Sequence, residues 1–296
     1  MQRPLVGRTR MNLQAVTASA WGILRYREPQ SAVRQRCGLF LVAFLYGLLA
    51  VATASLLFPG AMGIVAVFLH SLSLLAAFDW ILEKNGDDIW RRRIHPAHAN
   101  LDMTLSLLVL FSGALCVYFT IALLMPAVLG ARLFATQLEG AVVQLAQMHF
   151  AHFGPILAHN LVALLTFLFF ALLYRAGAVF AVVWNASVWG AIFGVTTTQA
   201  SVAGETTLMT ASKLLCCTMP HLVAEAVAYI LSAMAGMFLS KAMLKYRWSD
   251  AKFYQVLRAC TVILLLALGT LLLAACLESQ VAPWLVRRLF TTIPSP

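Results

Sequence analysis

Seven apolar stretches, each about as long as a membrane-crossing helix, constrain the fold of this chain more than any other feature. They cover residues 38–58, 61–78, 103–129, 156–174, 178–195, 214–243 and 259–276. A helix needs about 20 apolar residues to cross the hydrocarbon core of a bilayer. Only helices and closed β-barrels satisfy all of their backbone hydrogen bonds there. The sequence therefore predicts an all-α fold, a polytopic transmembrane helical bundle of about seven spans.

The composition supports a membrane protein and argues against nucleic acid binding. Hydrophobic residues make up 61% of the chain, charged residues only 11%, and the mean hydropathy is +0.85. A soluble domain carries about 25% charged residues. The net charge of +10 is spread in clusters of Lys and Arg beside the apolar stretches. This distribution predicts contact with anionic lipid headgroups and no nucleic acid partner.

The basic residues also predict the orientation of the chain. Seventeen of the 21 Lys and Arg residues precede the first span, fall in the connections on the same side of the membrane, or, as Lys241 does, lie at the span end beside one. The other four are Arg132, Lys213, Arg287 and Arg288. Because positive charge is enriched on the cytoplasmic side, we expect a cytoplasmic N-terminus and an extracytoplasmic C-terminus. We expect a multi-pass protein of the prokaryotic plasma membrane.

Three regions follow from the positions of the spans. Residues 1–36 form a basic cytoplasmic segment with no apolar core of signal-peptide length, so we expect no cleavable signal. Residues 37–102 form a transmembrane hairpin followed by an Arg-rich cytoplasmic loop over 79–102. Residues 103–296 form a five-span domain. Within it, the glutamines spaced through 131–153 predict an amphipathic helix at the membrane interface.

Polar residues within the last four spans form the candidate site. They are Asn160, Asn185, His221, Glu225 and, at the end of the last span, Glu278. A charged residue at the centre of a span costs about 2.5–3.5 kcal/mol on insertion scales, so such a residue indicates function when a partner accompanies it. The predicted topology gives these residues compatible depths toward the outer side. His221 and Glu225 are four residues apart and therefore share one helix face.

Three interpretations of this polar group remain open. A structural network would hydrogen-bond the helices and fix their packing. A proton- or ion-coupled substrate site would use the tendency of a carboxyl group to take up a proton in an apolar environment. A metal site would use the permissible His–Glu spacing, but no HExxH motif supports it. We therefore expect no metal and no cofactor. The six cysteines form no CxxC pair, and no nucleophile–base motif indicates an enzyme.

Small residues predict close helix packing in the second half of the chain. Gly177, Gly190 and Gly236 allow neighbouring helices to approach. Pro220 directly precedes the His221–Glu225 pair. We expect it in the first turn of a helix, where a proline removes no hydrogen bond.

Four segments of the second half, in order, carry a family resemblance. They are HNLVALLTFLFFALLYRAGAVF, WNASVWGAIFG, PHLVAEAVAYILSAMAG and LAACLESQVAPWL. Over about residues 103–285 the chain resembles the stage II sporulation protein M family of integral membrane proteins. The matching positions are Asn160, Gly177, Asn185, Gly190, Pro220, His221, Glu225, Gly236, Glu278 and Pro283.

The chain departs from that family in two places. Leu222 stands where the family usually has Gly, and the first hairpin with its Arg-rich loop is additional. The resemblance implies a membrane scaffold for cell-wall hydrolases in spore formers. In relatives that do not sporulate it implies a role in envelope assembly or transport. We therefore expect a non-enzymatic membrane protein that scaffolds or recruits envelope-remodelling partners. The alternative is a small-molecule or lipid-precursor transporter, or a permease subunit, with an intramembrane His/Glu site.

Overall fold

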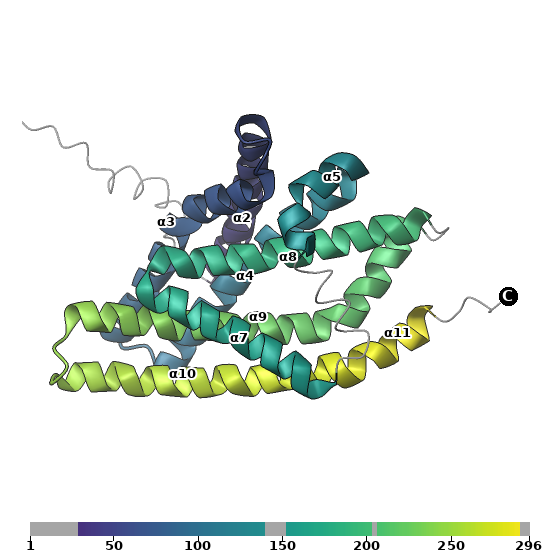
Figure 1. The fold of residues 1–296 in the computed structure, drawn as a ribbon. Helices are drawn as coiled ribbons and strands as arrows, with labels where there is room; N and C mark the ends of the chain where they lie inside the picture. Colours follow the sequence, from purple (N-terminus) through teal and green to yellow (C-terminus); the bar gives the residue numbers. More distant parts are fainter. Residues whose placement is uncertain (1–28, 140–151, 203–205, 291–296) are drawn as a thin grey trace, which may run out of the picture.

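The computed structural model describes residues 29–139, 152–202 and 206–290, and within these ranges the secondary structure is helical throughout. Seven of the described helices are long and apolar enough to cross a membrane, which confirms the predicted transmembrane bundle (Figure 1). They are α2 (Pro29–Leu57), α3 (Met62–Trp90), α4 (Pro96–Leu124), α7 (Phe153–Leu173), α8 (Arg175–Val202), α9 (Thr207–Lys245) and α10 (Ala251–Cys276). The chain is therefore a multi-pass membrane protein.

The prediction of a long charged loop over 79–102 is wrong, because most of these residues are helical. α3 continues to Trp90 and α4 begins at Pro96, so the turn is only 91–95. His95 caps α4 by accepting a hydrogen bond from the backbone N–H of Ala97 at 3.3 Å. Proline at the first helical position loses no hydrogen bond there. The polar residues of 79–102 thus lie on helix ends that extend beyond the apolar segments.

The next basic connection is also shorter than the sequence suggested. Residues 244–258 were expected to form a connector, but α9 runs to Lys245 and α10 starts at Ala251. Asp250 caps α10 by accepting from the N–H of Lys252 at 2.9 Å. An aspartate at this position stabilises the helix start, so the cap explains the early beginning of α10.

Part of the chain between α4 and α7 lies outside the described residues. α5 (Ala127–Leu133) follows α4, whereas 140–151, which holds most of the expected interfacial helix, is not described. Gly63 of α3 lies against the backbone of Leu133 and the side chain of Gln137. The start of this segment therefore packs on α3. Most of the basic segment 1–36 is likewise outside the described ranges.

α4 and α8 join the two halves of the bundle. A Cβ on Gly190 would lie 2.7 Å from the Cβ of Tyr118, and Gly194 sits against Ala122 four residues further along both helices. The two helices therefore run parallel, as the third and fifth spans of a chain that crosses at every span must. The glycines allow this close approach because they have no side chain.

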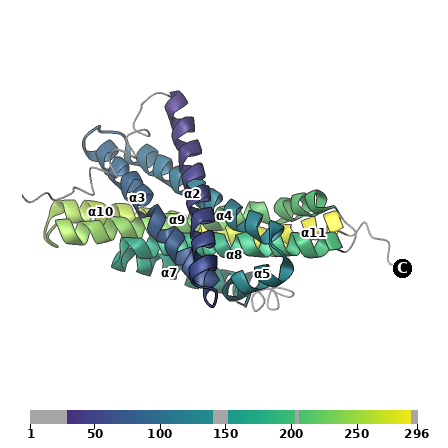
Figure 2. The same ribbon diagram turned by 90° about the horizontal axis from the view of Figure 1, so that it is seen from above.

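One hydrophobic core links α2, α3 and α4 with α7, α8, α9 and α10. α8 and α9 are the most buried spans, whereas α2, α7 and α10 expose most of their apolar surface. α2 lies across the direction shared by α8, α9 and α10 in both ribbon views (Figure 2). The boundary drawn from the sequence at 102/103 falls inside α4. The first hairpin is thus packed into the same core as the remaining spans.

Candidate functional site

α9 presents the two ionisable residues that the sequence singled out. It is continuous from Thr207 to Lys245 with Pro220 inside it, not in its first turn as expected. A proline within a helix cannot bond to the carbonyl four residues before it, here that of Cys216, and its ring crowds the preceding turn. Prolines account for most sharp helix bends, and α9 bends in Figure 1. His221 and Glu225 come shortly after the proline, in the part of α9 that is buried in the core.

Asn160 of α7 and Glu225 of α9 form a direct buried hydrogen bond. Asn160 Nδ2 donates to Glu225 Oε1 at 2.8 Å, and the residues are 5% and 3% exposed. Further along the same two helices, the Ser232 hydroxyl donates to the carbonyl of Leu164 at 2.9 Å. The two contacts show that α7 and α9 run parallel. They also fix the rotation of α9, so Glu225 must face α7.

Glu278 brings a second carboxyl group to this pair. It lies in η2 (Leu277–Val281), a short π-helical turn that connects α10 to α11 (Ala282–Phe290). Its side chain lies beside those of Glu225 and Asn160. One of its oxygens, Oε2, is buried without a hydrogen-bond partner among the described residues. Two neighbouring carboxyl groups hydrogen-bond to each other only when one of them is protonated, so this arrangement suits a shared proton.

The widened turn of η2 is relevant to this arrangement. π-helical turns are rare, and they occur often at functional sites. The sequence predicted that the last span ends at Cys276 and placed Glu278 at its boundary. In the structure the helix continues through η2 and α11 to Phe290. Glu278 is therefore held on a helix and not on a tail.

His221 lies one turn before Glu225 but is not hydrogen-bonded to it. The residue is 4% exposed, and its Nδ1 is buried without a partner among the described residues. Its ring meets the ring of Trp189 from α8 edge to face, with the centroids 6.2 Å apart. Buried polar side-chain atoms are usually paired, so this nitrogen is a second unsatisfied atom near the carboxyl groups.

Asn185 takes no part in the hydrogen-bonded cluster. It is half-buried on α8, and within the described residues its side chain makes no hydrogen bond. The structure therefore brings together Asn160, Glu225 and Glu278, places His221 one turn away, and leaves Asn185 apart.

The remaining glycines named from the sequence lie at close helix approaches. Gly177 is at the start of α8, where its N–H donates to the carbonyl of Tyr174 at 2.8 Å. A Cβ there would lie 2.9 Å from the carbonyl oxygen of Phe170. A Cβ on Gly236 would lie 2.7 Å from the Cβ of Ala171. Gly236 thus allows α9 to pack closely against α7 beyond the carboxyl cluster, toward the C-terminal end of α9.

Tyr229 belongs to the site but was not singled out from the sequence. It follows Glu225 by one turn, is 4% exposed, and lies near both Glu225 and Glu278. Its ring stacks on Phe167 of α7 with centroids 4.9 Å apart. The candidate site was built from charged, amide and histidine side chains, and tyrosine was passed over. The spacing of four from Glu225 was the available signal.

A second buried polar group lies in the first half of the bundle and was also missed. His70 of α3 is fully buried. Its Nε2 lies 2.9 Å from the carbonyl oxygen of Ala43, and its Nδ1 lies 3.3 Å from the hydroxyl of Tyr118. Because a carbonyl only accepts, Nε2 carries the hydrogen, and in the neutral ring Nδ1 accepts from Tyr118. The candidate residues all came from the last four spans, although a lone histidine within 61–78 was visible.

Within the part of the chain that the structure describes, no group of three or more His, Cys, Asp or Glu side chains could hold a metal ion. Comparison with protein-family models, curated proteins and solved structures finds no match to this chain. Its function is therefore inferred from the geometry of the residues themselves.

Proposed function

We propose that this protein is a plasma-membrane transporter or permease subunit of a prokaryote, and that it exchanges a proton at Glu225 and Glu278. The observation that carries the proposal is the meeting of these two carboxyl groups on one asparagine inside the bundle. Ionisable residues in membrane spans are rare and commonly belong to proton relays or substrate pathways.

A purely structural network would be built differently. Buried polar networks that only hold helices together have their polar atoms satisfied. This one leaves Glu278 Oε2 and His221 Nδ1 without partners in the described chain. An amide pair would join the same helices without a titrating group. These two unpaired atoms favour a site at which a proton or a ligand binds and leaves.

Protonation would also act on the shape of the bundle. With a shared proton, Glu225 and Glu278 attract each other and hold η2 against α7 and α9. Without it, two negative charges in a low-dielectric setting repel each other strongly. A ligand shifts an equilibrium only by its differential affinity for two states, and here the proton supplies that difference. Movement of η2 with α10 and α11 would then couple proton exchange to access from the outer side.

Glu225→Gln tests this proposal. The glutamine oxygen still accepts from Asn160 and the amide group donates to Glu278, so the fold should survive while the titrating group is lost. Purified protein in liposomes that contain a pH-sensitive dye is offered a panel of small polar metabolites and lipid precursors. We expect a compound that drives proton entry in the wild type and not in Glu225→Gln. Glu139→Gln changes an exposed glutamate and serves as the matched control.

The scaffold hypothesis predicts the opposite result. It is supported by the position of the residues that carry the family resemblance, since Asn160, Glu225 and Glu278 form one contact between α7, α9 and η2. For a scaffold, Glu225→Gln retains its partners and its function. Wild-type liposomes with no proton movement for any compound, together with unchanged capture of envelope proteins by Glu225→Gln, would contradict transport and support recruitment.

A further inference from the structure

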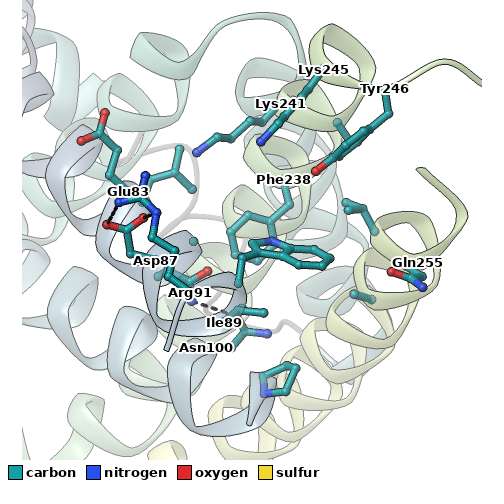
Figure 3. A pocket seen from close by; sticks show the side chains of 18 of the residues that line it. Glu83, Asp87, Ile89, Arg91, Asn100, Phe238, Lys241, Lys245, Tyr246 and Gln255 are labelled. Carbon is teal, nitrogen blue, oxygen red and sulfur yellow. Dashed lines mark hydrogen bonds and ion pairs between the residues drawn. The ribbon is translucent and has the colours of Figure 1, made fainter. Parts of the chain in front are cut away.

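A second candidate site lies at the opposite end of the bundle from Glu225. A cavity of about 870 Å³ opens where the end of α3 and the start of α4 meet the end of α9 and the start of α10 (Figure 3). Lys241, which lines it, follows Glu225 by 16 residues, which is about 24 Å along a helix. The cavity is therefore separate from the carboxyl cluster, and a ligand bound in it would be independent of the proposed function.

One wall of the cavity is basic. Lys241 and Lys245 are four residues apart on α9 and share a face, and Arg91 and Arg93 come from the turn between α3 and α4. Arg91 is occupied, because its Nε lies 3.3 Å from Asp87 Oδ1. Within the described ranges Lys241, Lys245 and Arg93 form no ion pair. Three positive charges thus line one cavity without forming an ion pair in the described chain, together with one carboxylate that is likewise unpaired there, Glu83.

Two backbone features bring these charges together. A Cβ on Gly86 would lie 4.0 Å from Lys241 Nζ, so the lysine reaches across from α9 to α3. Arg93 has a φ of 57°, a left-handed conformation that is costly for a residue with a side chain. This conformation turns the chain so that Arg93 lines the cavity together with the lysines. The N–H of Ile94 donates to the carbonyl of Asp88 at 2.9 Å, so the left-handed residue also ends α3 as helix C-caps commonly do.

The other wall of the cavity is apolar. Ile89, Trp90, Phe238 and Val256 line it, and Figure 3 shows Phe238 between the lysines and the turn at Arg91. Trp90 ends α3 with half of its surface exposed, a position typical of the membrane–water interface. A phosphate ion would leave this wall unused. A volume within the range of about 300–1,000 Å³ suits an amphiphilic ligand.

We propose that this cavity binds one anionic phospholipid from the leaflet on the basic, predicted cytoplasmic side. Its phosphate lies among Lys241, Lys245 and Arg93, and an acyl chain follows Phe238 and Val256. Charge-assisted hydrogen bonds from Arg and Lys are the usual means of holding a phosphate. Of the two acidic residues that line the cavity, Asp87 is paired with Arg91, and Glu83 is exposed.

Native mass spectrometry of the full-length protein in detergent micelles tests this site. The micelles contain phosphatidylglycerol or phosphatidylcholine at matched concentration, and the number of bound lipids is counted. We expect one phosphatidylglycerol retained by the wild type, and at least tenfold weaker retention in K241Q/K245Q. K252Q/R258Q is the matched control, since it removes the same charge from exposed positions of the same membrane side that do not line the cavity.

A second variant tests the cavity rather than its charge. Gly86→Leu keeps every basic residue, places a side chain in the cavity, and suits a helix better than glycine does. We expect it to lose the lipid as K241Q/K245Q does. If K241Q/K245Q and the control K252Q/R258Q lose bound lipid equally, the lipid is attracted by surface charge in general, and the proposal is overturned. Wild-type protein that retains no lipid would also overturn it.

Two further outcomes would assign the cavity to another ligand. Glycerol phosphate or inorganic phosphate that displaces the lipid at equal concentration would identify a soluble phosphate as the occupant. Unchanged lipid retention in K241Q/K245Q, with loss of a co-purifying acidic protein, would identify a protein-docking surface. Either result would overturn the assignment to a phospholipid.

Discussion

Two of the buried polar groups in the described part of the bundle differ in how many of their polar atoms have hydrogen-bond partners. In the first half, both nitrogens of His70 have a partner, and so does the hydroxyl of Tyr118. In the second half, Asn160 and Glu225 are bonded, whereas Glu278 Oε2 and His221 Nδ1 have no partner in the described chain. The first group is closed by the protein itself. The second has unused positions, and that difference is what separates a structural contact from a candidate site.

The locations of the two groups agree with this distinction. His70 is enclosed where α2, α3 and α4 meet, and Tyr118 also packs on Phe134. The carboxyl cluster instead involves η2, which is the end of a peripheral span and leads into the exposed helix α11. An element at the edge of the bundle therefore borders the second group and not the first. Four predictions test this comparison.

The largest effect is expected for Gly190→Val. The new Cβ would lie 2.8 Å from the carbonyl oxygen of Leu115 and from the N–H nitrogen of Phe119, and backbone atoms cannot move aside as side chains do. α4 and α8 would separate, and Tyr118 would leave His70. We expect the free energy of unfolding to fall by about 3 kcal/mol, which is the upper end of the usual cost of overpacking a core. Gly269→Val is the control, because nothing lies within 4 Å of its Cβ. Thermal unfolding in detergent is measured for both variants, and equal midpoints for Gly190→Val and Gly269→Val would contradict the close packing of α4 on α8 at Gly190.

The second prediction concerns His70→Leu, which leaves the Tyr118 hydroxyl buried without its partner. An unpaired buried polar group costs about 1–3 kcal/mol, so we expect a loss of about 2 kcal/mol. Adding Tyr118→Phe removes the unpaired group, and the double variant should regain part of the stability. Unfolding by denaturing detergent compares the single and double variants. Proton movement in liposomes should be unchanged in any variant that folds. A double variant less stable than His70→Leu would contradict the closed pair.

Particular residues show what the sequence determines and what it leaves open. The spans were predictable because each needs only enough consecutive apolar residues. Their ends were not, since capping by His95 and Asp250 extends α4 and α10 into charged sequence. The type and depth of Asn160, Glu225 and Glu278 were readable, but their meeting was not. It depends on the rotation of α9 after Pro220 and on the π-turn of η2, and hydropathy specifies neither. The cavity at Lys241 joins residues about 150 positions apart and has no local signal.

The third prediction concerns the strength of the Asn160–Glu225 bond. Hydrogen bonds between membrane helices average about 0.6 kcal/mol and reach about 2 kcal/mol. We expect a double-mutant cycle with Asn160→Ala and Glu225→Ala to give a coupling of about 1 kcal/mol. Glu225→Gln alone should change stability by less than about 0.5 kcal/mol, because both partners of the carboxyl group are kept. The stability of each variant is measured under the same denaturing detergent titration. If Glu225→Gln lowers the free energy of unfolding by more than about 2 kcal/mol, the carboxyl cluster stabilises the fold as much as His70 does, and the contrast between the two groups is lost.

The smallest effect is expected for Asp102→Asn, and it locates the source of stability in the first half. Asp102 receives a hydrogen bond from Arg36 at 3.0 Å and another from Lys84, so one carboxylate joins α2, α3 and α4. Its side chain is 33% exposed, and exposed ion pairs contribute about 0–1 kcal/mol. We expect a loss of about 0.5 kcal/mol that shrinks further at high salt, since salt screens exposed charges. If Asp102→Asn lowers the free energy of unfolding as much as His70→Leu does, the ion pairs of Asp102 stabilise the first half as strongly as the buried histidine. The pair of His70 and Tyr118 would then no longer be the main polar contact of the first half.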